Sequence, residues 1–210
     1  FGLAPGTFYA SSDGGQRWTA TAATGLTLDE PDAFAAAPDG SLLVSRFIGT
    51  TTDATSTWQA KVWRSTDRGA TWTIAYDATV VRTDDMFTGE AHRFVGVAPD
   101  GAWIATDAVS HDGGVSWQRT EVEGDRGLAF LTRRGNLVTP SPDGTWRVYA
   151  SGGLGELQGA YEVEIDGMTI PASQLRSVAF DDAGHAYVAG GAPYVRIWRS
   201  LTPVEALAQR

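Results

Sequence analysis

Short apolar segments and tight turns alternate along the whole chain. In one recurring unit, an apolar segment is followed by a turn such as Asp-Gly and then by a second apolar segment, and the copies begin near residues 34, 94, 128 and 178. Short runs rich in β-branched and aromatic side chains predict strands, and Asp, Gly and Pro predict the turns between them. The pattern therefore predicts an all-β chain of antiparallel hairpins.

A second unit alternates with the first and carries one pattern three times. Residues 11–18, 65–72 and 110–117 each read Ser-x-Asp-x-Gly-x-x-Trp. In a hairpin turn of this kind, Asp accepts hydrogen bonds from backbone N–H groups two or three residues on, Gly adopts a positive φ, and Trp covers the turn. We therefore assign structural roles to the repeated residues. They are Ser11, Asp13, Gly15, Trp18, Ser65, Asp67, Gly69, Trp72, Ser110, Asp112, Gly114 and Trp117.

The repeated pattern resembles the Asp-box of the BNR-repeat β-propellers, a group that includes sialidases and non-catalytic propellers. The resemblance implies four-stranded antiparallel blades, in which each box joins the two outer strands on the face away from the active face. The units are spaced by about 35 to 60 residues, as in propeller blades. We expect one domain of about five blades over residues 1–210, with hairpins near 7–20, 33–75, 93–120, 127–165 and 177–205. Either the N-terminal hairpin completes the last blade, or the chain belongs to a larger propeller.

Composition narrows the classes of partner and the compartment. The formal net charge is −9 and the pI is about 4.7, which argues against nucleic acid and against insertion into or binding to an anionic membrane. The chain has no Cys, so disulfides and thiolate chemistry are excluded. The resemblance favours an extracytoplasmic location: secreted, periplasmic or at the cell surface. A single Lys and a single Asn indicate a GC-rich genome and hence a bacterial source.

Candidate binding residues are expected in longer loops on the face opposite the boxes, near 22–32, 47–60, 76–92, 120–127 and 159–175. The loop 84–93 could offer a general acid, a base and an anion-binding Arg, or it could be a solvated acidic loop. Trp58, beside the hydroxyls of 55–57, could stack on a sugar or pack at a blade edge. The candidate binding residues are Asp29, Glu30, Asp53, Trp58, Asp84, Asp85, Glu90, His92 and Arg93.

No metal site or cofactor is assigned. Carboxylates from 28–32 and 84–93 could hold Ca²⁺ through oxygen ligands, although neither loop has the pattern of an EF-hand. The three histidines are far apart in the sequence and lack the spacing of a zinc site. A bound metal is therefore not part of the expected site.

The resemblance to sialidases does not extend to a catalytic set. Sialidases of this kind need three substrate-binding arginines, a Tyr–Glu pair, an Asp acid/base and an Arg-Ile-Pro motif near the start, whereas here Arg196-Ile197-Trp198 lies near the other end. We assign no catalytic residue and expect a non-catalytic binding or scaffold propeller. It would be an exported accessory or structural subunit that recognises a protein partner through its loop face. The alternatives are a lectin-like carbohydrate-binding propeller and a fragment of a glycoside hydrolase.

Overall fold

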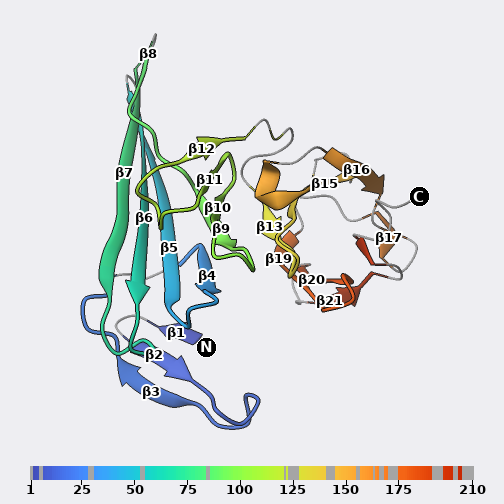
Figure 1. Ribbon diagram of the computed structural model, residues 1–210, viewed down its shortest axis with the longest axis horizontal. Helices are drawn as coiled ribbons and strands as arrows, with labels where there is room; N and C mark the ends of the chain where they lie inside the picture. The colour runs from blue at the N-terminus through green and yellow to red at the C-terminus, as the bar shows by residue number, and fades with distance from the viewer. Residues whose placement is uncertain are drawn as a thin grey trace.

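The fold is built almost entirely from strands and turns (Figure 1). The computed structural model describes residues 2–4, 7–27, 31–52, 55–83, 86–120, 122, 128–140, 145–154, 157–162, 164–165, 168–169, 175–190, 196–200 and 203–204. These residues include no α-helix, and a 3₁₀ turn spans Ser151–Gly153. No helix in this part of the chain is long and apolar enough to cross a membrane. The predicted all-β class is confirmed.

Each sheet is an antiparallel meander in which strands that follow one another in the sequence pair. The first sheet contains β1 (Gly2–Ala4), β2 (Thr7–Ala10) and β3 (Thr19–Ala22). The second contains β4 (Ala33–Ala36), β5 (Leu42–Thr51), β6 (Thr55–Ser65), β7 (Thr73–Thr83) and β8 (Met86–Thr88). The third contains β9 (Phe94–Val97), β10 (Trp103–Ala105), β11 (Ala108–Ser110) and β12 (Gln118–Arg119).

The C-terminal half continues the same pattern. The fourth sheet contains β13 (Phe130–Leu131), β14 (Leu137–Pro140), β15 (Thr145–Tyr149) and β16 (Leu157–Glu162). A short ribbon of β17 (Glu164–Ile165) and β18 (Met168–Thr169) follows it. The fifth sheet contains β19 (Leu175–Phe180), β20 (Ala186–Gly190) and β21 (Arg196–Arg199).

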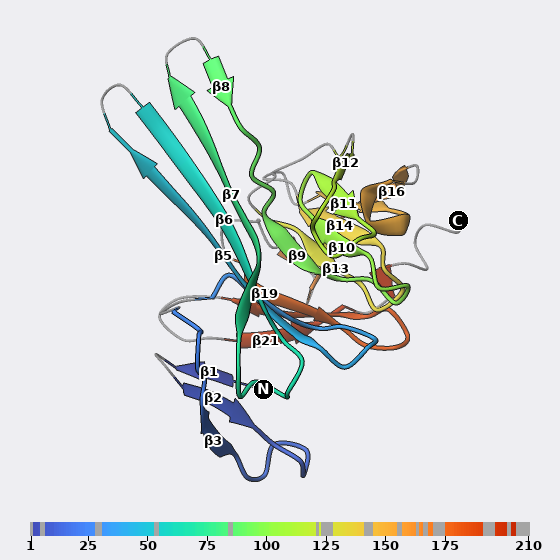
Figure 2. The same cartoon turned by 60° about the vertical axis from the view of Figure 1, so that its left-hand side comes forward.

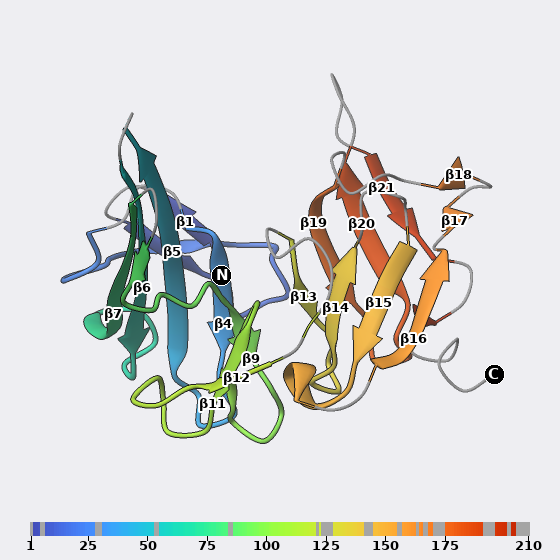
Figure 3. The same cartoon turned by 90° about the horizontal axis from the view of Figure 1, so that it is seen from above.

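The first strands of four sheets line one central cavity, and the arrangement of these strands is seen from above in Figure 3. The cavity has a volume of about 730 Å³, and β4, β9, β13 and β19 all contribute to its lining. β4 and β9 are rich in Ala, Gly and Val, so the backbone can be approached closely there; a Cβ added to Gly96 of β9 would lie 3.3 Å from Leu131 of β13. Meanders arranged around an axis in this way form a β-propeller.

The number of sheets agrees with the expected number of blades. Five sheets of three or more strands lie in the described part of the chain. Strands β1–β3 pair with one another, and no described strand of this sheet pairs with β19–β21. The described strands therefore do not show the N-terminal hairpin completing the last blade.

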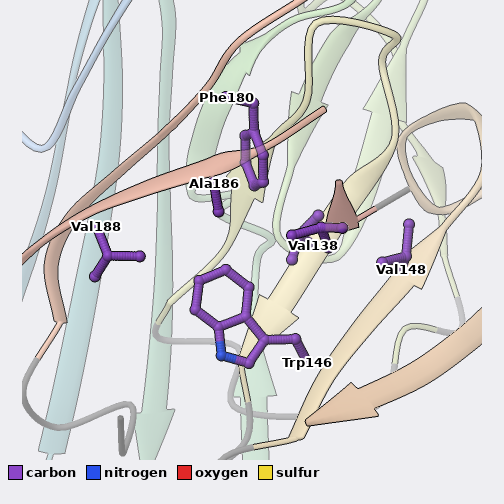
Figure 4. Packing of buried hydrophobic residues seen from close by; sticks show 7 residues of the cluster. Val138, Trp146, Val148, Phe180, Ala186 and Val188 are labelled. Carbon is purple, nitrogen blue, oxygen red and sulfur yellow. The ribbon is translucent and has the colours of Figure 1, made fainter. Parts of the chain in front are cut away.

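Apolar layers between neighbouring sheets hold the propeller together. Figure 4 shows the layer between the fourth and fifth sheets, where Trp146, 1% exposed, packs with Val138, Phe180 and Val188. Similar clusters join the other neighbouring sheets. Burying one large apolar side chain contributes roughly 1.5–3 kcal/mol, so each layer is a substantial part of the stability.

The three motif turns share one hydrogen-bond pattern. In the second copy, Ser65 Oγ donates to Asp67 Oδ1 at 2.8 Å, and the N–H of Gly69 donates to Ser65 Oγ at 2.8 Å. The N–H of Thr71 donates to Asp67 Oδ1 at 2.8 Å, and Trp72 Nε1 donates to the carbonyl of Gly69 at 2.8 Å. The same bonds recur in the first and third copies. The backbone N–H that donates to the Asp carboxylate in all three copies thus belongs to the residue four positions further along the chain, whereas the sequence predicted two or three positions.

The motif turns lie at the same end of the propeller as the turns between the first two strands of the second, third and fourth sheets. Arg64, just before the second motif, bonds to Asp39 of the turn between β4 and β5 at 2.6 Å. A cavity of about 250 Å³ is lined both by Asp100 and Gly135, from two such turns, and by His111 and Ser151, from turns after third strands. The opposite end is called the loop face below.

The prediction that residues 47–60 and 76–92 form loops is wrong for most of these residues. Residues 42–51, 55–65 and 73–83 form the long strands β5, β6 and β7, which pair with each other throughout. β-Branched Thr, Val and Ile favour extended structure, and pairing satisfies the backbone groups of these polar segments. The outer part of this sheet, residues 47–51, 55–60, 76–83 and 86–88, projects from the rest of the molecule (Figure 2). We call this part the arm.

Candidate functional site

A buried histidine joins the second and third sheets near the loop face. The side chain of His92, just before β9, is 2% exposed, and its Nδ1 lies 3.1 Å from Asp107 Oδ1. Its Nε2 lies 3.6 Å from Glu90 Oε2. The backbone N–H of His92 donates to the hydroxyl of Tyr76 on β7 at 3.2 Å. Groups from three parts of the chain therefore hold the imidazole between two carboxylates.

Aromatic rings enclose this histidine. The ring centroid of Trp117 lies 5.0 Å from that of His92, and Tyr76 lies 5.3 Å from Trp117. Burial raises the pKa of the Tyr76 hydroxyl, and the negative charges of Asp107 and Glu90 act in the same direction. Tyr76 therefore remains a neutral phenol that can hydrogen-bond with the His92 backbone.

The exposed rim of the cluster is an ion pair. Glu90 Oε1 accepts a hydrogen bond from Arg119 Nη2 at 2.7 Å, and the two side chains are 56% and 67% exposed. Solvent screens such a pair, so its contribution to stability is small. Glu90 thus links the buried imidazole to a charged surface that a partner could contact.

A second pair of charges lies at the mouth of the central cavity. Asp32 Oδ1 and Arg93 Nη2 are 3.7 Å apart, and both residues line the cavity together with Thr106. The N–H of Thr106 donates to the carbonyl of Arg93 at 2.9 Å, which fixes the start of β9 against the turn after β10. The rest of the lining combines apolar side chains, among them Val95 and Phe180, with the polar residues Thr132 and Arg133.

The arm carries the remaining candidate residue. Trp58 lies on β6, opposite Gly49 of β5 and Val80 of β7. A Cβ added to Gly49 would lie 3.0 Å from Trp58 Cδ1, so the indole covers the position where a larger residue would place its side chain. Ile48, on the other face of the arm, is 44% exposed. The arm thus presents apolar groups to solvent on a paired, hydrogen-bonded sheet.

The structure brings together only some of the predicted site residues. Glu90 and His92 contact each other, and Arg93 points instead to the cavity mouth with Asp32. Trp58 lies in a strand of the arm, apart from both groups. The remaining candidates, which lie outside the described residues, are Asp29, Glu30, Asp53, Asp84 and Asp85.

The residues that complete the histidine cluster, Tyr76 and Asp107, were not among the predicted site residues. Tyr76 and Asp107 lie 16 and 15 positions from His92 along the chain, in elements of different sheets. No spacing rule connects such positions, because the contact depends on how the second and third sheets pack. The sequence offered one signal for Asp107: it lies two residues after the apolar segment that forms β10, at the loop face.

The chemistry available to these groups is limited by access. His92 is enclosed, and its neighbours Glu90 and Asp107 already provide its ring contacts, so a bound substrate would not reach the imidazole. The described residues contain no group of three or more His, Cys, Asp or Glu side chains arranged to hold a metal ion. The surface features that remain for recognition are the Glu90–Arg119 rim, the cavity mouth and the arm.

The sheets and their shared cavity define a β-propeller. No family model matches the chain, and no curated protein matches it. Among solved structures, it is similar to YCF48 bound to D1 peptide, with 15% identity over 93% of this chain and a TM-score of 0.46. The chain spans 58% of the length of that protein chain.

Two further solved structures are similar to the chain. One is the alpha-L-arabinanase of Penicillium chrysogenum complexed with arabinobiose, with 13% identity, coverage of 95% of this chain and 85% of that one, and a TM-score of 0.37. The other is the WD40 beta propeller domain of Doa1, with 12% identity, coverage of 94% and 87%, and a TM-score of 0.36. The assignment of the architecture rests on the sheets themselves.

Proposed function

We propose that the chain is a non-catalytic binding or scaffold propeller of the Asp-box (BNR-repeat) type. It would act as an exported accessory or structural subunit and recognise a protein partner through its loop face. The single observation that carries this proposal is the arm, which extends the second sheet beyond the packed layers of the propeller (Figure 2). The three motif turns, with one shared hydrogen-bond pattern, support the Asp-box assignment.

The arm has the properties of a recognition element. Its strands pair along their full length, and Asp77 bonds across the sheet to Gln59 at 3.1 Å and to Lys61 at 3.2 Å, which stiffens the base. A rigid element loses little conformational entropy on binding. Ile48 and Trp58 are apolar side chains of the kind that anchor protein interfaces. The arm therefore suits a protein partner better than a small ligand.

The state of the candidate acid and base groups also supports a binding role. His92 is enclosed, Glu90 pairs with Arg119, and Asp32 pairs with Arg93. A glycoside hydrolase needs two carboxylates on opposite sides of the bond to be cleaved. Among the described residues that line the central cavity, Asp32 is the one carboxylate.

A carbohydrate or other small ligand in the central cavity is the second candidate. The observation that favours it is the cavity volume of about 730 Å³, which falls within the usual range of about 300–1,000 Å³ for ligand pockets. Asp32, Arg93 and Thr106 could orient a polar ligand at the mouth. Binding of a glycan that is lost in Arg93→Ala and kept in arm variants would favour this candidate over a protein partner.

The test is the native mass of the protein isolated from its source, with mass spectrometry of whatever elutes with it at constant stoichiometry. We expect a complex, and we expect Ile48→Asp to release the partner because it places a charge on the arm. Val115→Asp is the matched control, since Val115 is 85% exposed in a motif turn at the opposite end. A free chain of about 22.3 kDa in the wild type, or equal release by both variants, would overturn the proposal.

A further inference from the structure

One edge of the arm is an open row of backbone groups. On the inner side of β5, the strand pairing with β4 ends at Ser45, which lies opposite Ala33. On its other side, β5 pairs with β6 along its whole length, as far as Thr51 opposite Ser56. Within the part of the chain that the structure describes, residues 47–51 therefore have a strand on one side only.

Alternate residues of β5 face this open edge. The N–H of Asp32 donates to the carbonyl of Ser45 at 2.9 Å, and the N–H of Phe47 donates to Asp32 Oδ2, so Ser45 and Phe47 direct their backbone groups away from β6. In a strand, the N–H and C=O of one residue point to the same side, and the side alternates with each residue. The open groups are thus the carbonyl of Phe47, both backbone groups of Gly49 and the N–H of Thr51.

This edge lacks the usual protection against strand pairing. Natural edge strands are commonly short, charged, bulged or interrupted by Pro. Residues 47–51 read Phe-Ile-Gly-Thr-Thr, with no charge and no Pro, and residues 48–51 are exposed. Within the described residues, the N–H of Phe47 is the one outward N–H of this edge with a partner, and that partner is a carboxylate oxygen in the place where a neighbouring strand would offer a carbonyl.

The side-chain pattern indicates what a strand at this edge would need. Gly49 has no side chain, and the indole of Trp58 lies over it from the next strand. Residues directly opposite each other in an antiparallel sheet share a face. A residue added opposite Gly49 would therefore place its side chain on the same face as Trp58, with only Gly49 between them. An apolar or aromatic side chain fits this position.

We propose that the β5 edge, residues 47–51, binds an extended segment of a protein partner by strand addition, with an apolar or aromatic side chain beside Trp58. This proposal rests on the proposed function and names the binding mode of the arm. Main-chain hydrogen bonds at Phe47, Gly49 and Thr51 supply the binding, and the position beside Trp58 supplies the selectivity. The partner therefore contributes a strand, not a helix or a folded surface.

The test compares two substitutions at one position. Thr51→Pro removes the outward N–H, whereas Thr51→Val keeps it, and both lose the bond between the hydroxyls of Thr51 and Ser56. Random nonapeptides displayed on phage are selected on the full chain, and an enriched peptide is synthesised for binding and amide-exchange measurements. We expect Thr51→Val to bind like the wild type and Thr51→Pro to bind about tenfold more weakly, the effect of losing about one hydrogen bond. The amides of Gly49 and Thr51 should gain protection from exchange.

A second measurement leaves the protein unchanged, in case Thr51→Pro disturbs the arm. The enriched peptide is made in two forms, with N-methyl groups on its odd or on its even residues. Strand addition predicts that one form loses binding and the other keeps it, because only one set of amides faces β5. Equal binding of both forms, protection of other amides, or no enrichment over selection on Thr51→Pro would overturn the proposal.

The native complex separates this proposal from the proposed function. If Ile48→Asp releases the partner and Thr51→Pro does not, the arm binds a protein but not by strand addition. If neither variant releases the partner, recognition through the arm is itself wrong. Release by both variants, with Thr51→Val retaining the partner, supports both proposals.

Discussion

Gly69 of the second motif turn lies directly against the ring of Phe8 on β2. A Cβ at this glycine would be 2.4 Å from Phe8 Cδ1, and the φ of Gly69 is +94°. Phe8 is fully buried and also contacts the ring of Trp72, at 5.7 Å. The second motif turn thus serves both as a hairpin turn and as the surface on which the first sheet packs.

We therefore expect Gly69→Ala to be strongly destabilising. Overpacking costs about 1–3 kcal/mol, and a side chain in the left-handed region adds about 1–2 kcal/mol, so a loss of about 3 kcal/mol is expected. Gly15→Ala is the matched control, because Gly15 has a φ of +90° and its nearest neighbour would be Trp18 at 3.8 Å. Chemical denaturation of both variants should show the control losing about 1–2 kcal/mol, the left-handed cost alone. Equal losses would show that packing on Phe8 does not matter.

The motif aspartates should make the fold sensitive to acid. The hydroxyl of Thr71, followed by its N–H and by Ser65, lowers the pKa of Asp67 to about 2, and Ser116 does the same for Asp112. A carboxyl with a depressed folded-state pKa contributes stability that is present above its unfolded pKa, near 4. That contribution is lost as the pH falls through the folded pKa, so the melting temperature should fall between pH 4 and 2.

Substitution at Thr71 tests the origin of this acid sensitivity. Thr71→Val removes the hydroxyl that donates to Asp67 Oδ2, so the pKa of Asp67 should rise and the melting temperature should depend less on pH between 4 and 2. Thr71→Ser keeps a hydroxyl at the same position and should retain the wild-type profile. Melting curves across this pH range check both variants. A profile of Thr71→Val that matches the wild type would contradict the assigned cause.

Much of the fold was predictable because its signals are local. The Asp and Gly of residues 11–18, 65–72 and 110–117 specify a turn by hydrogen bonds within the motif itself. The arm was not predictable in the same way. Residues 47–51, 55–60 and 76–83 contain many Thr residues and resemble polar loops. They form strands because each strand satisfies the backbone hydrogen-bonding groups of its neighbour.

The candidate site was less predictable than the fold because its contacts lie between sheets. Glu90 and His92 are close in the sequence, and their proximity was expected. The partners that enclose His92, Tyr76 and Asp107, come from β7 and from the turn after β10. These residues come into contact because two sheets pack together, and no periodicity or spacing in the sequence predicts that packing.

The layer between the fourth and fifth sheets can be tested at one tryptophan. Trp146 is 1% exposed, and its replacement by Ala should leave a cavity against Phe180 and Val188 and cost about 3–5 kcal/mol. Trp18→Ala is the control, because Trp18 is 49% exposed in the first motif turn. Its loss should be about 1 kcal/mol, mainly the hydrogen bond from Trp18 Nε1 to the carbonyl of Gly15. Thermal or chemical denaturation measures both losses of stability. Equal losses in the two variants would contradict the placement of Trp146 in the core and of Trp18 at the surface.

The histidine cluster should act as a structural link between the second and third sheets. Asp107→Ala removes the carboxylate that contacts His92 Nδ1 and leaves a polar atom of a buried ring without this partner, at a cost of about 1–3 kcal/mol. Glu90→Gln, at the exposed rim, keeps a group able to accept a bond from Arg119 and should cost less than about 1 kcal/mol. Denaturation measures both costs, and the native mass assay measures partner retention. A structural link predicts that Asp107→Ala lowers stability while the folded variant retains the partner. Loss of the partner from a folded Asp107→Ala protein would instead place the cluster in the binding surface.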